Sequence, residues 1–111
     1  RDLVRSRGLG DVYKRQALID FNFHGLKTIG VKSFSNSGIT SVHIEKGTTV
    51  RENCFSNCKS LTKVEWKSNK EIRNGTFEKC PNLKEVLVSE QVKAIEADAF
   101  KKSPNAEISF I

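Results

Sequence analysis

The sequence predicts a solenoid of stacked short parallel strands, because one residue pattern recurs four times at nearly constant spacing. Four phenylalanines, 21, 22 and 23 residues apart, mark the repeat: Phe34, Phe55, Phe77 and Phe100. An aliphatic residue lies five positions before each of them: Ile29, Val50, Ile72 and Ile95. A small residue lies three positions after each: Ser37, Cys58, Cys80 and Ser103. Self-similarity at a fixed period of about 20–29 residues is the mark of a repeat architecture.

A second motif, with a leading apolar residue and two further apolar positions, follows each small residue. It reads Ile39-x-x-Val42-x-Ile44, Leu61-x-x-Val64-x-Trp66 and Leu83-x-x-Val86-x-Val88. A shortened copy, Ala106-x-Ile108-x-Phe110, closes the series, and half a copy, Leu18-x-x-Phe21-x-Phe23, precedes it. This core predicts a leucine-rich repeat solenoid, strand-rich within the α/β class, of about four and a half repeats.

The alternation of apolar and polar residues in the second motif predicts strands with one buried face. We expect parallel strands at about residues 19–23, 41–45, 63–67, 85–88 and 107–110, on the concave side of the coil. The apolar residues of each strand point inward, Trp66 included. A single helical or 3₁₀ turn around each phenylalanine is expected on the convex side, because it would turn that ring and the small residue three later the same way.

Residues 1–16 match no repeat position and resemble translated adapter sequence, so we expect a non-native or unstructured leader. This leader carries +3 of the net charge of +6. The repeat domain is therefore expected at 17–111, as a fragment of a longer array, since Phe110 and Ile111 end it without a polar cap. No apolar run approaches the roughly 18 residues that span a bilayer, so no membrane insertion is expected in this segment.

The pattern Val50-x4-Phe55-x2-Cys58-x2-Leu61-x2-Val64-x-Trp66 resembles the BspA-like leucine-rich repeats of bacterial and protist surface proteins. The resemblance covers residues 17–111 and is specific for the repeat type. It implies a curved, right-handed solenoid with its strands on the concave face. It also implies a cell-surface or secreted protein, because characterised relatives act as adhesins for matrix proteins, other cells or mucosal components.

The outward positions of successive strands form the candidate partner-binding face. They are Asp20, Asn22, His24, Ser41, His43, Glu45, Lys63, Glu65, Lys67, Glu85, Leu87 and Ser89, followed by Glu107 and Ser109. Equivalent positions on neighbouring strands would lie about 4.8 Å apart, so these side chains would make a flat platform. Neighbouring charges alternate, with Glu45 beside Lys67 and Lys63 beside Glu85. We expect a monomer that binds a protein or glycan ligand on this face.

Two other functions compete with adhesion. An intracellular interaction or signalling scaffold would use the same face. A nucleic-acid binder is suggested by the sequence pI of about 9.4. However, residues 17–111 are nearly balanced in charge and form no basic stripe, so no nucleic acid is expected as a partner.

No catalytic, cofactor or metal site is expected, and the chain is predicted not to be an enzyme. His24 and His43 fall on neighbouring outward positions, with Ser41 as the only nearby nucleophile, and are interpreted as solvated side chains. Metal binding would need a tight cluster, and both histidines belong to the opposite side of the coil from the cysteines.

The three cysteines are interpreted as small buried side chains. Cys58 and Cys80 share one repeat position, where parallel side chains rarely reach the dihedral angle of about 90° that a disulfide needs. Cys54 occupies the small-residue position before Phe55. The triplet Asn74-Gly75-Thr76 is a glycosylation sequon on the back of the coil, and Gly75 also suits a turn.

Overall fold

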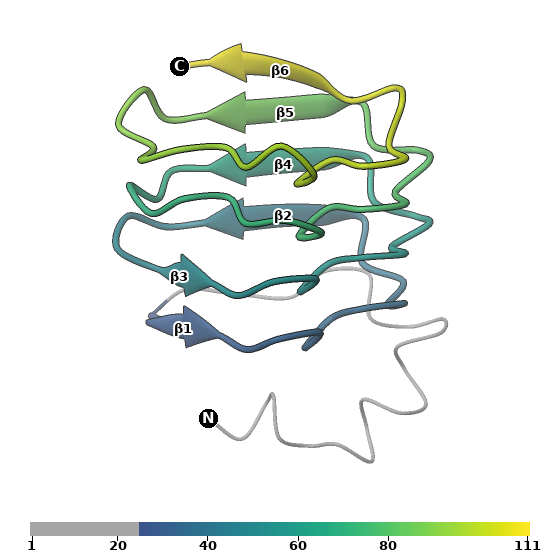
Figure 1. The fold of residues 1–111 in the computed structure, drawn as a ribbon, viewed down its shortest axis with the longest axis horizontal. Helices are drawn as coiled ribbons and strands as arrows, with labels where there is room; N and C mark the ends of the chain where they lie inside the picture. Colours follow the sequence, from purple (N-terminus) through teal and green to yellow (C-terminus); the bar gives the residue numbers. More distant parts are fainter. Residues whose placement is uncertain (1–24) are drawn as a thin grey trace.

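The computed structural model describes residues 25–111, which wind into a solenoid with four parallel strands along one side (Figure 1). These strands are β2 (Ser41–Ile44), β4 (Lys63–Trp66), β5 (Glu85–Val88) and β6 (Glu107–Phe110), in the sheet order β2-β4-β5-β6. Equivalent motif positions are paired: Val42 with Val64, Val64 with Val86, and Val86 with Ile108. The strands expected at 41–45, 63–67, 85–88 and 107–110 are confirmed. The strand expected at 19–23 lies outside the described residues.

A second parallel ladder runs behind the first and was not expected as strands. It contains β1 (Thr28–Ile29) and β3 (Thr49–Val50), with Ile29 paired to Val50. An isolated parallel bridge between Ile72 and Ile95 continues the same line in the upper coils. The aliphatic residues five positions before each phenylalanine therefore pack in or against the core and also join neighbouring coils through the backbone.

The four marker phenylalanines form one continuous stack along the axis. The ring centroids of Phe34 and Phe55 lie 5.6 Å apart, those of Phe55 and Phe77 5.4 Å, and those of Phe77 and Phe100 5.4 Å. The interplanar angles are 11°, 6° and 13°, so the rings are nearly parallel. Offset stacking of this kind adds about 0.5–1.5 kcal/mol per pair to the burial of the rings. The equivalence of the repeats inferred from sequence is thereby confirmed in three dimensions.

The single helical or 3₁₀ turns expected around each phenylalanine are not present in residues 25–111. Consecutive tight turns replace them, with bonds such as Ser35 N–H to Lys32 O and Ser37 N–H to Phe34 O. A helix cannot continue through these turns, because the residues two before and two after each phenylalanine have positive φ, except the one before Phe100. They are Lys32 (58°) and Asn36 (64°), Asn53 (57°) and Asn57 (59°), Gly75 (76°) and Lys79 (58°), and Lys102 (62°). Left-handed residues end a right-handed helix.

Those turns free backbone groups that bond between coils instead of within a helix. The N–H of Phe34 donates to Cys54 O, that of Phe55 to Thr76 O and that of Phe77 to Ala99 O, each at 2.9 Å. Two residues later the N–H groups of Asn36, Asn57 and Lys79 donate to the next coil in the same way. Both sides of the solenoid are therefore tied together by main-chain hydrogen bonds, and these satisfy groups that would otherwise be costly to bury.

The interior is one apolar column, and Trp66 is its largest fully buried side chain. Its ring meets Phe77 edge to face, with centroids 6.0 Å apart, and its indole N–H donates to Lys70 O at 3.1 Å. The inward placement predicted for Trp66 is confirmed. In the last described coil, Ile108 and Phe110 occupy the inward motif positions and are 40% and 55% exposed.

Candidate partner-binding face

The candidate site is the outer surface of the four-stranded sheet, called here the strand face. It consists of the outward side chains of Ser41, His43, Glu45, Lys63, Glu65, Lys67, Glu85, Leu87, Ser89, Glu107 and Ser109. Each of these is exposed or half-buried, whereas the alternate residues of β2, β4 and β5 are buried. The predicted outward register is confirmed for every candidate in residues 25–111. Asn22 and His24, with Asp20, lie outside the described residues.

The strand register sets the rows of this face. Ser41, Lys63, Glu85 and Glu107 form one row, and His43, Glu65, Leu87 and Ser109 form the next. Lys63 lies beside Glu85 as expected, but no ion pair joins them within residues 25–111. This row therefore carries one lysine beside two glutamates, and Lys63 also attracts the carboxylate of Glu65 in the next row.

One close polar contact on the face was not foreseen from the sequence. Nδ1 of His43 lies 2.8 Å from Oε1 of Glu65 on the adjacent strand. This hydrogen bond, with further attraction from Lys63 and Lys67, lowers the pKa of Glu65 below its usual value. His43 was interpreted as a solvated side chain; it is half exposed, but Glu65 holds it in one orientation. Cross-strand pairs of this kind contribute about 0.2–1 kcal/mol.

Leu87 is the one large apolar side chain on the strand face. It lies between Glu65 and Ser109 in the second row and is half-buried by its neighbours. A partner that covered it would gain about 1.5–3 kcal/mol from complete burial, less the share its neighbours already bury. The face thus combines a fixed imidazole–carboxylate pair, two lysines and one apolar contact point.

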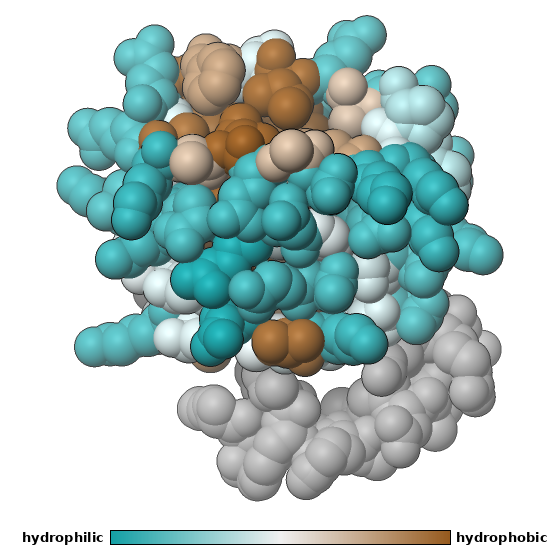
Figure 2. All heavy atoms as spheres, in the orientation of Figure 1, coloured by the Kyte–Doolittle hydropathy of each residue, from teal (hydrophilic) through white to brown (hydrophobic). Residues whose placement is uncertain are grey.

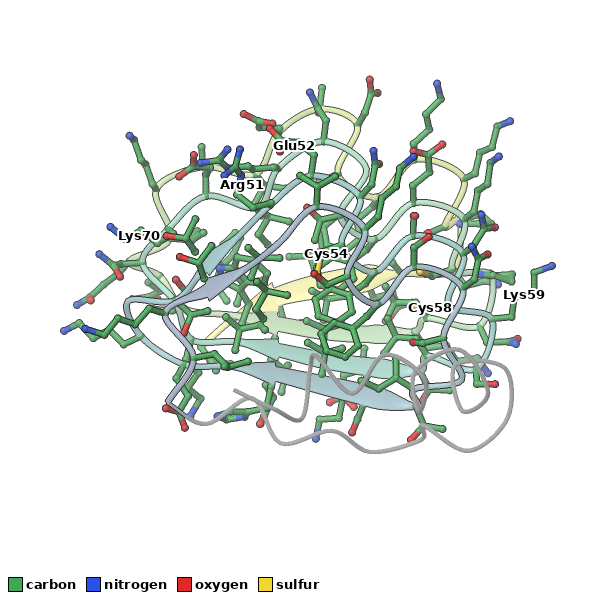
Figure 3. The ribbon with its side chains drawn as sticks, turned by 90° about the horizontal axis from the view of Figure 1, so that it is seen from below. Arg51, Glu52, Cys54, Cys58, Lys59 and Lys70 are labelled. Atoms are coloured by element: carbon green, nitrogen blue, oxygen red, sulfur yellow. The ribbon has the colours of Figure 1, made fainter. Side chains whose placement is uncertain are left out.

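The cysteines lie away from this face, inside the coil, and all three are free. Figure 3, a view along the axis, shows Cys54 and Cys58 within the coil, while Lys59 and Lys70 point outward from its edges. Burial raises the pKa of Cys80 to about 12 and raises the pKa of Cys54 and Cys58 as well. These thiols are therefore not nucleophiles at neutral pH. Residues 25–111 also contain no group of His, Cys, Asp or Glu side chains placed to hold a metal ion.

The shared position of Ser37, Cys58, Cys80 and Ser103 does more than fill space. The side chains of Cys58, Cys80 and Ser103 donate to the carbonyl oxygens of Phe34, Phe55 and Phe77, one coil below, at 3.2, 3.3 and 2.6 Å. The occurrence of Ser or Cys at this repeat position could have indicated these hydrogen bonds from the sequence, because both side chains are small and both can donate.

The back of the coil carries a second polar cluster that the sequence did not reveal. Arg73 lies 3.4 Å from Glu52 and 3.2 Å from Glu71, and Glu52 also lies 3.7 Å from Arg51. Figure 3 shows Arg51 and Glu52 at the outer edge opposite the strands. Attraction to Arg73 helps to lower the pKa of both carboxylates, after the larger effect of their backbone hydrogen bonds. The charges of these four side chains therefore partly neutralise one another on the back of the coil.

The sequon triplet has a structural role at each position. Oδ1 of the exposed Asn74 accepts the N–H of Asp98 at 2.9 Å, and the buried Thr76 hydroxyl donates to Arg73 O at 2.7 Å. Gly75 has φ of 76°, and a Cβ there would overlap the side chain of Asn53. The triplet is thus accounted for by the geometry of the turn.

Comparison with known protein families agrees with the leucine-rich repeat solenoid described above. The family model of the BspA type leucine rich repeat region matches residues 11–111, with six copies. The chain belongs to this family. The BspA-type match begins within the stretch 1–16 that sequence reasoning set apart as a leader. Searches of curated proteins and of solved structures gave no match.

Membership defines the general role of the chain. Leucine-rich repeats of the BspA type serve as scaffolds for protein interaction, are generally non-enzymatic and are commonly associated with the cell surface. No helix in residues 25–111 has the length and apolar character needed to cross a membrane.

Proposed function

We propose that this chain is an adhesion module that binds a protein partner outside the cell through the strand face. The observation that carries the proposal is the row of His43, Glu65 and Leu87, which places a fixed polar pair beside an apolar contact on three hydrogen-bonded strands. Side chains mounted on paired strands lose little freedom when they bind, so more of the contact energy remains as affinity.

The composition of the face favours a protein over a glycan. Its outward positions in β2, β4, β5 and β6 include no Trp, Tyr or Phe on which a sugar ring could stack. Lys63, Glu85 and Glu107 instead offer charges of both signs at intervals of about 4.8 Å, and a protein surface can match such a row with opposite charges. A partner with one apolar residue over Leu87, ringed by charges, fits this arrangement.

Direct binding with matched variants tests the proposal. Residues 1–111 are passed over immobilised collagen, laminin and mucin, with the double variant Lys63→Glu/Leu87→Glu beside the wild type. The control is Lys79→Glu/Val31→Glu, which changes one exposed lysine and one exposed apolar residue away from the strand face. We expect the strand-face variant to lose at least about tenfold in affinity, or ~1.4 kcal/mol, and the control to bind normally.

Two results would overturn this assignment. Equal binding by the wild type and the strand-face variant would place the interaction elsewhere. Tight retention on heparin or DNA with a steep salt dependence, and no binding to the three protein probes, would favour a nucleic-acid partner. The heparin measurement is made on residues 17–111 as well, because the basic stretch 1–16 would otherwise dominate it.

A further inference from the structure

One edge of the solenoid is strongly basic. Each coil crosses this edge after its phenylalanine turn, on the way to the next strand, at the right of Figure 1. Residues 56–62, 78–84 and 101–106 form it in three successive coils, and this surface is called here the return edge. Figure 2 shows mainly hydrophilic side chains on this side of the molecule. The half-buried Glu78 is the one acidic residue of the three segments, which carry five exposed lysines: Lys59, Lys79, Lys84, Lys101 and Lys102.

The basic character is present inside the stack of coils. Lys59, Lys79 and Lys84 each have a described coil below and above them, yet all three side chains are exposed. Hydrogen bonds between coils fix the backbone from which they project. Nδ2 of Asn82 donates to Lys59 O at 2.6 Å, and the N–H of Lys79 donates to Lys101 O at 2.9 Å. In Figure 3, Lys59 accordingly points away from the coil at its edge.

The charges of the return edge are not neutralised within the described part of the chain. None of its five lysines forms an ion pair in residues 25–111. The opposite edge, where the chain leaves the strands, is nearly balanced, because residues 45–48, 67–71 and 89–94 carry four lysines and three glutamates. A surface with one sign of charge raises the local concentration of ions of the other sign.

The sequence analysis expected no basic stripe, and this expectation is wrong for the return edge. Lys59 lies four positions after its phenylalanine, Lys79 lies two positions after the next one, and Lys84 directly follows the leading leucine of its strand motif. Because these positions are not equivalent in the repeat, the sequence pattern does not show them as a row. Winding of the coils brings them onto one edge.

The chemistry of this edge favours a linear polyanion made of sugars. Its lysines belong to successive coils about 4.8 Å apart, so the positive charge runs along the solenoid axis. The three segments contain no Trp, Tyr or Phe on which a nucleic-acid base could stack. They also contain no Arg, the residue that grips phosphate with two parallel hydrogen bonds. Sulfate groups carried directly on sugar rings need neither, because the point charge of a lysine ammonium is enough to attract them.

We propose that the return edge binds a sulfated polysaccharide, whose chain runs along the solenoid axis across the lysines of successive coils. The attraction is electrostatic, so binding weakens steeply as the salt concentration rises. The site shares no residue with the strand face and does not rest on the adhesion function proposed above. The two proposals together predict retention on heparin alongside binding to a protein probe.

Heparin binding by two charge-matched variants tests the site. The return-edge variant is Lys59→Ala/Lys79→Ala/Lys84→Ala, and the control, Lys27→Ala/Lys46→Ala/Lys93→Ala, removes three exposed lysines elsewhere. All proteins comprise residues 1–111, so the basic stretch 1–16 contributes equally to each. At physiological salt the return-edge variant should lose at least about tenfold in affinity for heparin, and the control at most about threefold. The slope of log affinity against log salt should fall by roughly one for each lysine removed from the return edge.

Three results would overturn the site or its ligand. Equal losses in the two variants would show that heparin responds to the net charge alone, and an unchanged return-edge variant would place the contact elsewhere. Dextran sulfate should displace heparin better than single-stranded DNA does at equal concentration of charge, and equal displacement would rule out the preference for a sulfated glycan. Binding to collagen or laminin should be the same in the wild type and the return-edge variant. This last measurement separates the return edge from the strand face, because only the adhesion proposal depends on it.

Discussion

The sulfur of Cys80 lies 3.3 Å from the carbonyl oxygen of Phe55, a residue 25 positions earlier in the chain. This contact joins one coil to the coil below and is repeated by Cys58 with Phe34 and by Ser103 with Phe77. At these three positions the side chain three residues after the phenylalanine is small enough for the core and donates a hydrogen bond to the coil below.

Substitutions of Cys80 should separate donation from packing. Cys80→Ser keeps a donor and should change the free energy of unfolding by less than about 1 kcal/mol. Cys80→Val keeps the bulk but withdraws the donor from a buried carbonyl group, at a cost of about 1–3 kcal/mol. Urea denaturation followed by circular dichroism checks both. Equal stability of the two variants would mean that this position is selected for size alone.

The thiols should be inert in the folded chain at pH 8. Burial raises the pKa of Cys54, Cys58 and Cys80, so the thiolate is not populated there. Reaction with an alkylating agent should be slow in buffer and fast in urea. Mass spectrometry would measure the extent of labelling at each cysteine. Fast labelling in buffer would contradict the burial.

The same pKa shifts predict a loss of stability in alkali. A folded-state pKa above the ordinary value of 9.0 means that the unfolded chain releases these protons first. Stability from the neutral thiols is therefore complete below about pH 9 and falls as the pH rises towards about 12. The urea midpoint of the wild type should decrease between pH 8 and 10.5, and Cys80→Ser should flatten this decrease.

Two glycines should respond differently to alanine. Gly75 and Gly47 both have positive φ, 76° and 86°, so alanine strains either backbone by roughly 1–2 kcal/mol. Only at Gly75 does the new Cβ overlap another group, the Asn53 side chain; at Gly47 nothing lies within 4 Å. Gly75→Ala should therefore lower the urea midpoint clearly more than Gly47→Ala. Similar losses would show that Asn53 moves aside freely.

The contact between His43 and Glu65 should be visible in the titration of the carboxylate. The imidazole lowers the pKa of Glu65 below the ordinary 4.5, so this carboxylate stays ionised to lower pH in the folded chain. His43→Ala should raise that pKa towards its usual value, as measured by carbon NMR. Lys79→Ala, on the back of the coil, is the control and should leave it unchanged. An unaltered pKa in His43→Ala would show that the hydrogen bond does not form in solution.

The strands and the core could be predicted from the sequence because the residue patterns that indicate them extend over several residues and recur in each repeat. Each of β2, β4 and β5 alternates buried and outward residues, and the marker phenylalanines fix the register between coils. The second ladder could not be predicted, because β1 and β3 are two residues long and show no alternation. Element length, rather than residue type, set this limit.

The turns and the polar contacts could not be predicted from sequence patterns, for a different reason. Lys32, Lys79 and Lys102 adopt positive φ, although lysine carries no preference for that region. At Lys32 and Lys79 the positive φ goes together with a hydrogen bond from the backbone N–H to the next coil. On the strand face the register correctly predicted which residues are neighbours, but side-chain geometry chose His43 with Glu65 as the pair that forms.

The single tryptophan of the chain has a practical consequence. Trp66 is sealed in the middle of the coil, edge-on to Phe77 and tethered by its indole N–H. Its fluorescence emission will therefore report on the central coil and will not change while only an end of the solenoid unfolds. Comparing that signal with backbone dichroism during denaturation would show whether the solenoid melts as one unit or unzips from its tips.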